Sequence, residues 1–261
     1  MHKAFDSILD AIGNTPIVQL KRSMPKGPHQ FFAKIEFMNP GASIKDRIAL
    51  AMVEDAEKTG RIKPGGTIVE ATSGNTGVGL AMVAAVKGYK CIFVMPEKIS
   101  EEKRATLRAY GAQVVITPTG VAPEDPRSHY SVAAKFVEKI PNSFYVNQYD
   151  NPANAKKHYE TTGPEIWQQM DGKIDALVGG AGTGGTLSGC GRYLREKNSE
   201  MRVVCADPVG SILYDLFYHK KVIDPAGSYL VEGIGDDMLP KNVHFDVMTD
   251  FIRTNDTEAF A

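Results

Sequence analysis

Short apolar runs alternate with helical patterns along most of the chain. The first series consists of the strand FFAKIEF (31–37), a helix ending near Gly60, the strand TIVEA (67–71), a helix ending at Gly88, the strand CIFVM (91–95), a helix ending at Gly111 and the strand VVIT (114–117). Apolar strands that alternate with helices are typical of a parallel sheet covered by helices on both faces. The sequence therefore predicts an α/β fold.

A second series follows the proline-rich stretch VAPEDPRSHY (121–130). It contains a helix over 131–140, the strand FYVNQY (144–149), a long helix around Trp167, the strand DALVGG (175–180), another helix and the strand RVVCAD (202–207). Two lobes are expected. The last residues, TNDTEAFA, predict a helix start in which Asn255 and Glu258 cap each other. Only three residues follow Glu258, which is too few to complete a helix. We therefore expect the sequence to stop inside an element of secondary structure.

Charge and composition favour small-molecule chemistry. The chain of 261 residues carries 30 basic and 31 acidic residues, a balance that gives no footprint for nucleic acid or an anionic membrane. The polar N-terminus predicts no signal peptide, and the longest apolar run, Leu80 to Val86, is too short to cross a bilayer. Three cysteines without C-x-x-C spacing predict a reducing, cytoplasmic setting and no metal site.

Two glycine-rich turns stand between a predicted strand and a predicted helix. They are EATSGNTGVG (70–79) and GGAGTGGTLSG (179–189). Such turns present backbone N–H groups at a helix N-terminus, where anions bind. The second turn also contains G-x-G-x-x-G at Gly180, Gly182 and Gly185, with Asp207 after the next strand, so a nicotinamide-binding domain remains an alternative. Neither turn ends in Gly-Lys-Ser/Thr, which excludes a P-loop.

Lys45, in GASIKDRIA (41–49), lies at the start of a predicted helix, where the helix dipole disfavours a positive charge. Ser43 and Asp46 predict a helix N-cap, which places Lys45 in the first turn, on one stripe with apolar residues at 49, 52 and 56. Apolar neighbours and the helix dipole both lower the pKa of an amine. A nucleophilic lysine with one cradle for a phosphate and another for a carboxylate suggests pyridoxal phosphate and an amino-acid substrate.

Six segments resemble the fold type II pyridoxal-phosphate enzymes, in particular cystathionine β-synthases and O-acetylserine sulfhydrylases (cysteine synthases). They are IGNTPIVQL, NPGASIKDRIA, EATSGNTGVGLA, NQYDNPANAKKHYETTGPEIW, GTGGTLSG and VEGIGDDMLP. The resemblance implies a two-lobe α/β fold of mostly parallel sheets. Residues 39–143 would form a smaller mobile lobe with the substrate-carboxylate loop. Residues 1–38 and 144–261 would form the larger phosphate-binding lobe, incomplete at its C-terminus.

The resemblance also implies roles for individual residues. Lys45 would be the catalytic, Schiff-base lysine. Asn75 would bind the cofactor's ring hydroxyl, and its phosphate would lie on Gly182, Thr183, Gly184, Gly185 and Thr186. The substrate residues would be Thr72, Ser73, Gly74, Thr76, Gln148, Tyr149, Ser211, Glu232 and Gly233. We also expect a homodimer.

The implied reaction is β-replacement on serine or O-acetylserine through an aminoacrylate. Homocysteine as the second substrate would give cystathionine, and sulfide would give cysteine. NQY with Tyr149, Ser211 in DPVGSIL and Glu232 in VEGIG are similar to the cystathionine β-synthases, whereas NPANAKKHYETTGPEIW is closer to the sulfhydrylases. Asp236 stands where many cystathionine β-synthases have tyrosine. His158 is interpreted as a packing and hydrogen-bonding residue, and Trp167 as core.

Overall fold

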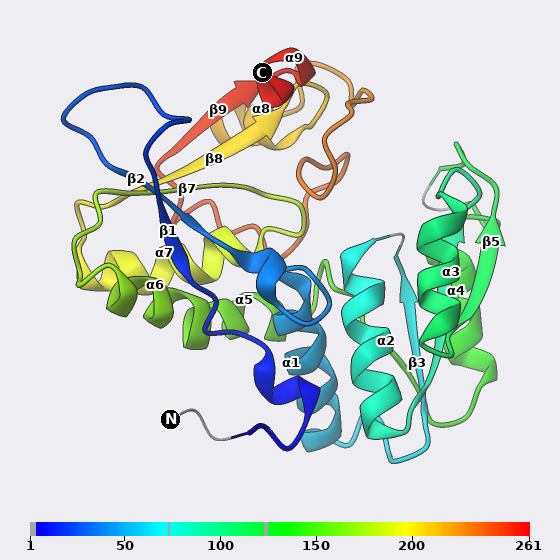
Figure 1. Cartoon of the computed structure of the whole chain (residues 1–261). Helices are drawn as coiled ribbons and strands as arrows, with labels where there is room; N and C mark the ends of the chain where they lie inside the picture. Colours follow the sequence, from blue (N-terminus) through cyan, green and yellow to red (C-terminus); the bar gives the residue numbers. More distant parts are fainter. Residues whose placement is uncertain (1–3, 73, 123–124) are drawn as a thin grey trace. The chain divides into compact units, whose positions relative to one another are not determined.

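The computed structural model describes residues 4–72, 74–122 and 125–261. The chain divides into two compact units, Met1–Asn147 and Gln148–Ala261, and each is described by itself. Figure 1 traces the elements of both units in chain order. The two lobes expected from the sequence are a smaller one formed by residues 39–143 and a larger one formed by residues 1–38 and 144–261. This division stays a prediction.

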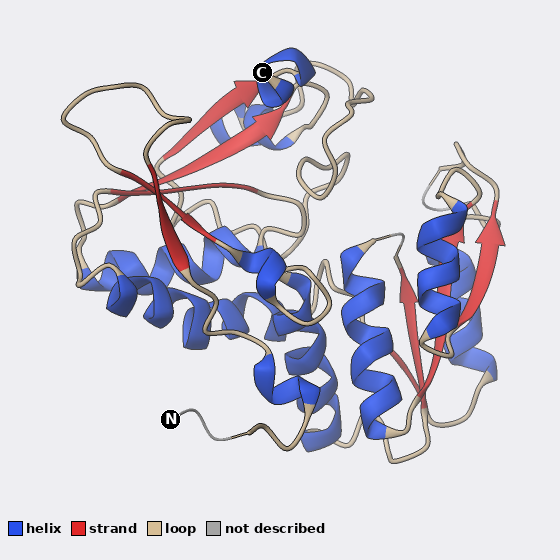
Figure 2. Ribbon diagram, viewed as in Figure 1, coloured by secondary structure: helices blue, strands red, loops and turns tan. Residues whose placement is uncertain are grey.

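The first unit is built on a parallel sheet whose strand order is β5-β4-β3-β6 (Figure 2). Its strands are β3 (Thr67–Ala71), β4 (Lys90–Pro96), β5 (Gln113–Thr117) and β6 (Ser143–Tyr145). All of β3 and nearly all of β4 are buried, as expected of central strands covered on both faces. An antiparallel pair, β1 (Ile17–Leu20) and β2 (Phe31–Lys34), forms a separate small sheet.

The helices of this unit are α1 (Lys45–Lys58), α2 (Asn75–Lys87), α3 (Glu101–Ala109) and α4 (His129–Lys139), with short 3-10 turns η1 (Ile8–Ala11) and η2 (Glu36–Met38). Three of them, α2, α3 and α4, connect successive parallel strands, and α1 precedes the first of those strands, β3. Ala133 of α4 packs in one apolar cluster with Val69 and Ala71 of β3 and with Ile92 and Val94 of β4. This cluster fixes α4 on one face of the sheet.

The second unit contains a parallel sheet of order β7-β8-β9. Its strands are β7 (Ala176–Gly180), β8 (Arg202–Pro208) and β9 (Asp250–Thr254). Its helical segments are α5 (Ala153–Lys157), the π-helical turn η3 (His158–Thr162), α6 (Gly163–Gln169), α7 (Gly185–Lys197), α8 (Leu213–His219) and α9 (Asp256–Phe260). The strand–loop–helix unit β7–α7 places the second glycine-rich turn at the carboxyl end of β7.

The α/β fold with parallel sheets is confirmed. The long helix expected around Trp167 is interrupted, because the π-helical turn η3 separates α5 from α6. The mutual cap of Asn255 and Glu258 is confirmed, with Glu258 N–H donating to Asn255 Oδ1 and Asn255 N–H donating to Glu258 Oε2. Among the described helices, none combines the length and apolar character needed to span a membrane.

Candidate active site

Lys45 is the first residue of α1, so the predicted first-turn position is confirmed. Its side chain is partly buried, and its stripe partners Ala49, Met52 and Ala56 are fully buried. Burial lowers the pKa of the Lys45 amine below its ordinary value. A larger share of this amine is therefore neutral near pH 7 than for a surface lysine, as a nucleophile requires.

The predicted cap of α1 is wrong in its details. Ser43 Oγ accepts from the N–H of Lys45 at 3.2 Å, and the Asp46 carboxylate accepts from the N–H of Gly41 at 2.5 Å instead of closing on Ser43. Gly41 and Asp46 are so close that a Cβ at position 41 would collide with Asp46 Oδ1. The hydrogen bond from Gly41 N–H to the Asp46 carboxylate, five residues later, thus holds the loop before Lys45 against the first turn of α1.

Asp46 is a fully buried carboxyl group beside Lys45 in sequence. Burial raises its pKa to about 6, the hydrogen bond from Gly41 opposes this, and the charge of Glu36 adds to the rise. Its Oδ1 has no hydrogen-bond partner among the described residues. The start of α1 therefore contains a carboxyl group that is easily protonated.

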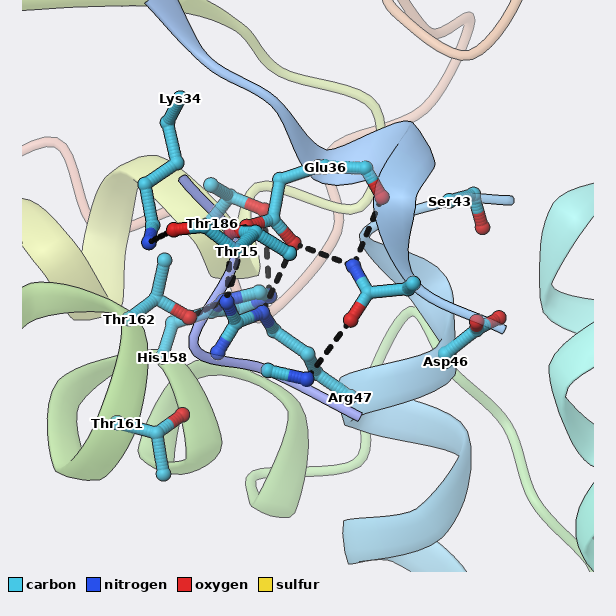
Figure 3. A network of polar contacts seen from close by, with 12 residues as sticks. Thr15, Lys34, Glu36, Ser43, Asp46, Arg47, His158, Thr161, Thr162 and Thr186 are labelled. Carbon is cyan, nitrogen blue, oxygen red and sulfur yellow. Dashed lines mark hydrogen bonds and ion pairs between the residues drawn. The ribbon is translucent and has the colours of Figure 1, made fainter. Parts of the chain in front are cut away.

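A buried polar network holds the residues before α1 against the helix (Figure 3). The Arg47 guanidinium donates to both carboxylate oxygens of Glu36, at 2.8 and 2.9 Å. Thr15 Oγ1 and Asn39 Nδ2 also donate to this carboxylate, at 2.5 and 2.9 Å. Burial raises the pKa of Glu36, but the hydrogen bond and charge of Arg47, together with the hydrogen bonds from Thr15 and Asn39, outweigh it, so the net pKa is lowered. The network fixes the segment that precedes Lys45.

The first glycine-rich turn ends at the N-terminus of α2. Thr72 is buried and its Oγ1 accepts from Gly74 N–H at 3.4 Å; Thr76 is buried, whereas Asn75 is exposed. The predicted substrate residue Ser73 lies outside the described residues. Among the described residues, no side chain caps the N-terminus of α2, so its first N–H groups are suited to an anion.

Helices α1 and α2 are in close contact, and Figure 1 shows their N-terminal ends on the same side. A Cβ on Gly79 would lie 2.9 Å from Ala49 Cβ and 3.2 Å from Asp46 Cα. Gly79 is one turn after Asn75, and Asp46 follows Lys45. Lys45 at the start of α1 and Asn75 and Thr76 at the start of α2 therefore lie at the same end of one helix pair.

The second glycine-rich turn precedes α7. Gly184 has φ +83°, a left-handed conformation that favours glycine, and no side chain in the described part of the chain caps α7. A Cβ on Gly182 would lie 2.7 Å from Gly233 O, and one on Gly185 would collide with Asn154. Asn154 Nδ2 donates to Thr183 Oγ1 at 3.0 Å. The backbone of this loop is thus closely packed against Gly233 and Asn154. The N–H groups at the start of α7 suit a phosphate.

The other predicted substrate residues of the second unit lie in two places. Gln148 is buried. The side-chain amide of Asn242 donates to the main-chain carbonyl of Gln148 at 3.1 Å and to that of Tyr149 at 2.8 Å. Ser211 is buried, and its Oγ accepts from Asp236 N–H at 3.1 Å, while Glu232 is exposed. Gly233, at the turn VEGIG, contacts the phosphate-loop residue Gly182 as described above.

Asp236 is a second carboxyl group with a raised pKa. Burial is the largest cause, hydrogen bonding from the N–H of Met238 opposes it, and the charge of Asp237 adds to the rise, which brings the pKa to about 7. Burial thus favours the protonated form of Asp236 more than that of an exposed carboxyl group. Sequence reasoning notes it as a departure from tyrosine but could not foresee this property, which depends on burial.

The model of the family described as "Pyridoxal-phosphate dependent enzyme" matches residues 8–261. The chain belongs to this family. It is 50% identical over 260 residues to a cystathionine beta-synthase of Apis mellifera, covering 98% of this chain and 51% of that protein. It is 46% identical over 239 residues to cysteine synthase 1 of Neurospora crassa, covering 91% of this chain and 63% of that one. The chain thus spans about half to two thirds of the length of these curated relatives.

Two solved structures are similar to this chain over nearly its whole length. The hydrogen sulfide-producing enzyme Fn1220 from Fusobacterium nucleatum is similar with a TM-score of 0.90 and 35% identity, covering 100% of this chain and 82% of that one. O-ureido-L-serine synthase gives a TM-score of 0.89 at 39% identity, covering 98% of this chain and 77% of the other. The predicted family and its cofactor, pyridoxal phosphate, are confirmed.

The residues present fit this cofactor. The close approach of Gly182 and Gly233 and the left-handed Gly184 leave a bare backbone loop at a helix start, which suits a phosphate, and the Lys45 amine suits an aldehyde. The nicotinamide alternative needs an available carboxylate after the second strand. Asp207 is instead fully buried, and its Oδ2 accepts from Tyr214 N–H at 2.9 Å.

Proposed function

We propose that the protein catalyses a pyridoxal-phosphate-dependent β-replacement, in which serine or O-acetylserine reacts with homocysteine to give cystathionine. The observation that carries the reaction class is the Lys45 amine, partly buried on an apolar stripe, with a lowered pKa, beside a carboxylate-binding turn. The choice of homocysteine is supported by the similarity to cystathionine beta-synthases from several animals.

Lys45 has two tasks in this proposal. Its neutral amine would hold the cofactor through the aldehyde carbon, and once the substrate's amine has taken that place, the free Lys45 amine would take the substrate's α-proton. When bound, pyridoxal phosphate supplies the electron sink that makes this proton acidic. The leaving group would depart from the β-carbon with its electron pair, as hydroxide or acetate. The thiol would lose its proton to that leaving group or to solvent, its sulfur would form the new bond to the β-carbon, and the Lys45 ammonium would return the proton it had taken to the α-carbon.

The two turns hold the anionic groups. The Thr72–Thr76 turn binds the substrate carboxylate through its hydroxyl groups and the first N–H groups of α2, which fixes the α-proton relative to Lys45. The Gly182–Thr186 loop binds the phosphate through the N–H groups at the start of α7. Gln148 and Asn75 add amide groups for the carboxylate and for the ring hydroxyl.

Cysteine synthesis from sulfide is the second candidate. It is favoured by the similarity to cysteine synthase 1 of Neurospora crassa. The two thiols differ in size and in the amino-acid group that only homocysteine carries. Comparison of kcat/KM for homocysteine and sulfide, with serine and O-acetylserine in turn, therefore separates the candidates. A clear preference for sulfide would contradict the first proposal.

The lysine assignment has a direct test. Borohydride reduction of the cofactor-loaded protein followed by peptide mapping should label Lys45, and K45A should lose the absorbance between about 400 and 430 nm that a lysine-bound cofactor gives. The matched control is K58A, since Lys58 is an exposed residue at the other end of the same helix. Label on another lysine, or full absorbance in K45A, would overturn the assignment.

A further inference from the structure

Glu70 is a buried charged residue in the central strand β3. Its side chain is 1% exposed, and it lies across from Phe93 of β4, which is fully buried. Because side chains alternate between the two faces of a strand, Glu70 points away from the face on which Val69 and Ala71 pack with α4. Burial of a carboxylate costs free energy unless hydrogen bonds compensate it. Apolar packing therefore does not explain this residue.

The Glu70 carboxylate binds the backbone just beyond β6. Its Oε2 accepts from Asn147 N–H at 2.7 Å. One residue earlier, Val146 N–H still donates to Val69 O of β3, at 3.1 Å. Asn147 itself has φ +49°, a left-handed conformation that turns the chain out of the extended path of a strand. Glu70 thus takes up the N–H group of the residue at which the chain leaves the sheet.

This hydrogen bond lies one residue before Gln148, a predicted ligand of the substrate carboxylate. Within the second unit, the main-chain carbonyl of Gln148 accepts from the side-chain amides of Asn154 and Asn242, at 2.9 and 3.1 Å. The backbone is therefore held by Glu70 on the N-terminal side of Gln148 and by two amides at its carbonyl. A side chain on such a fixed backbone loses little freedom when it binds a ligand.

Glu70 is also two residues before Thr72, where the Thr72–Thr76 turn begins. Strands β3 and β6 are parallel neighbours, so their carboxyl ends lie at the same edge of the sheet. Thr72 follows the end of β3, and Asn147 lies just beyond the end of β6. One side chain thus connects the two chain segments that lead into the predicted carboxylate ligands.

We propose that Glu70 is a positioning residue for the substrate carboxylate. It holds the N–H of Asn147 and so fixes the backbone that leads into Gln148. The residue does not touch the substrate, and it acts through this backbone alone. The inference rests on the proposed function, because it takes Gln148 as a ligand of that carboxylate.

The test is a set of dissociation constants for L-alanine, measured by absorbance titration of the full chain loaded with pyridoxal phosphate. L-alanine has no leaving group on its β-carbon and so binds without the replacement reaction. L-alaninamide, in which a neutral amide replaces the carboxylate, is titrated in parallel. E70M removes the acceptor and keeps an apolar stem, whereas E70Q keeps a carbonyl oxygen for the N–H of Asn147.

We expect E70M to weaken L-alanine binding about tenfold, the size of one hydrogen bond to a charged group. L-alaninamide binding should stay within twofold, and E70Q should recover most of the loss. E57M is the matched control, since Glu57 is a partly exposed carboxylate of the same unit that accepts from Lys87 and Tyr89. It should bind L-alanine within twofold of the wild type.

Three further measurements keep the test independent of any folding defect in E70M. E70D keeps the charge on a side chain one methylene shorter, and it should also weaken L-alanine severalfold. In the double variant E70M/Q148A the loss should not exceed that of Q148A alone, because Glu70 acts through Gln148. Amide hydrogen exchange of the cofactor-free chain should be faster at Asn147 in E70M and E70D than in the wild type or E70Q.

The possible failures are distinguishable. Wild-type protein that takes up no pyridoxal phosphate would refute the proposed function. Wild-type uptake with unchanged L-alanine affinity in E70M and E70D would refute only the role of Glu70. Equal losses for L-alanine and L-alaninamide, or additive losses in the double variant, would also refute it, since they are the results expected of a merely structural carboxylate.

Discussion

Replacement of Arg47 by methionine tests whether the polar network of the first unit stabilises the start of α1. Methionine keeps most of the apolar stem of arginine and removes the guanidinium group. Arg47 is 1% exposed and the Glu36 side chain 14%, and two hydrogen bonds join them, at 2.8 and 2.9 Å (Figure 3). R47M therefore leaves the Glu36 carboxylate largely buried without its cation.

The expected cost follows from this burial. Removal of one partner of a buried ion pair typically destabilises a protein by about 3–5 kcal/mol. We expect about 3 kcal/mol, since Glu36 keeps some solvent and the hydrogen bonds from Thr15 and Asn39. The lowered pKa of Glu36 stabilises the fold above its unfolded pKa, and this contribution is lost as the pH falls through the folded value. The difference between wild type and R47M should therefore be largest near pH 7 and shrink below about pH 4.

The assay is urea unfolding followed by far-UV circular dichroism at pH 7 and pH 4. R108M is the matched control, because Arg108 pairs with Glu101 at the surface, where both side chains are about half exposed or more. That variant should change the free energy of unfolding by less than about 1 kcal/mol. The double variant E36Q/R47M should recover part of the loss. A loss below about 1 kcal/mol in R47M at pH 7, or one independent of pH, would refute the reasoning.

Two further variants test single contacts. Relative to D46N, wild type should lose roughly 3 kcal/mol of unfolding free energy as the pH rises from about 4 to 6, because a folded Asp46 pKa raised by about two units destabilises the ionised form. Paired pH series of urea unfolding curves for the two proteins check this. G189A should destabilise the second unit by about 1–3 kcal/mol or more through collision with Ala155, whereas G27A, which meets no atom within 4 Å, should change thermal unfolding little.

Local periodicity was enough to predict the surroundings of Lys45 but not the details of its cap. The stripe of residues at spacings of four and three along α1 depends only on helix geometry, and those positions are buried as expected. Ser43 and Asp46 have the spacing of a cap, but the carboxylate of Asp46 finds the N–H of Gly41 instead. A choice between two nearby N–H groups depends on how the preceding loop folds, which residue spacing does not determine.

His158 shows why part of the site could not be predicted from the sequence. Sequence reasoning assigns it packing and hydrogen bonding, and its contacts with Thr162 and Thr186 confirm that assignment. Its partner Thr186 is 28 residues away, and the π-helical turn that positions the ring leaves no periodic signal in HYETT. The glycine-rich turns were recognisable because their chemistry is local, whereas this contact depends on tertiary packing.

The two glycine-rich turns also use the same packing device. Gly79 and Gly189 are each the fifth residue of the helix that their turn opens, and at each of them a neighbouring element approaches too closely for a side chain. Gly79 admits α1, whose first residue is Lys45, and Gly189 admits η3, whose first residue is His158. A glycine one turn into the helix thus lets another element, whose first residue is basic, pack against the first turns of the helix at whose start the anion is expected. Because a larger residue at either position would push that element away, we infer that these glycines are needed for the reactive groups as well as for packing.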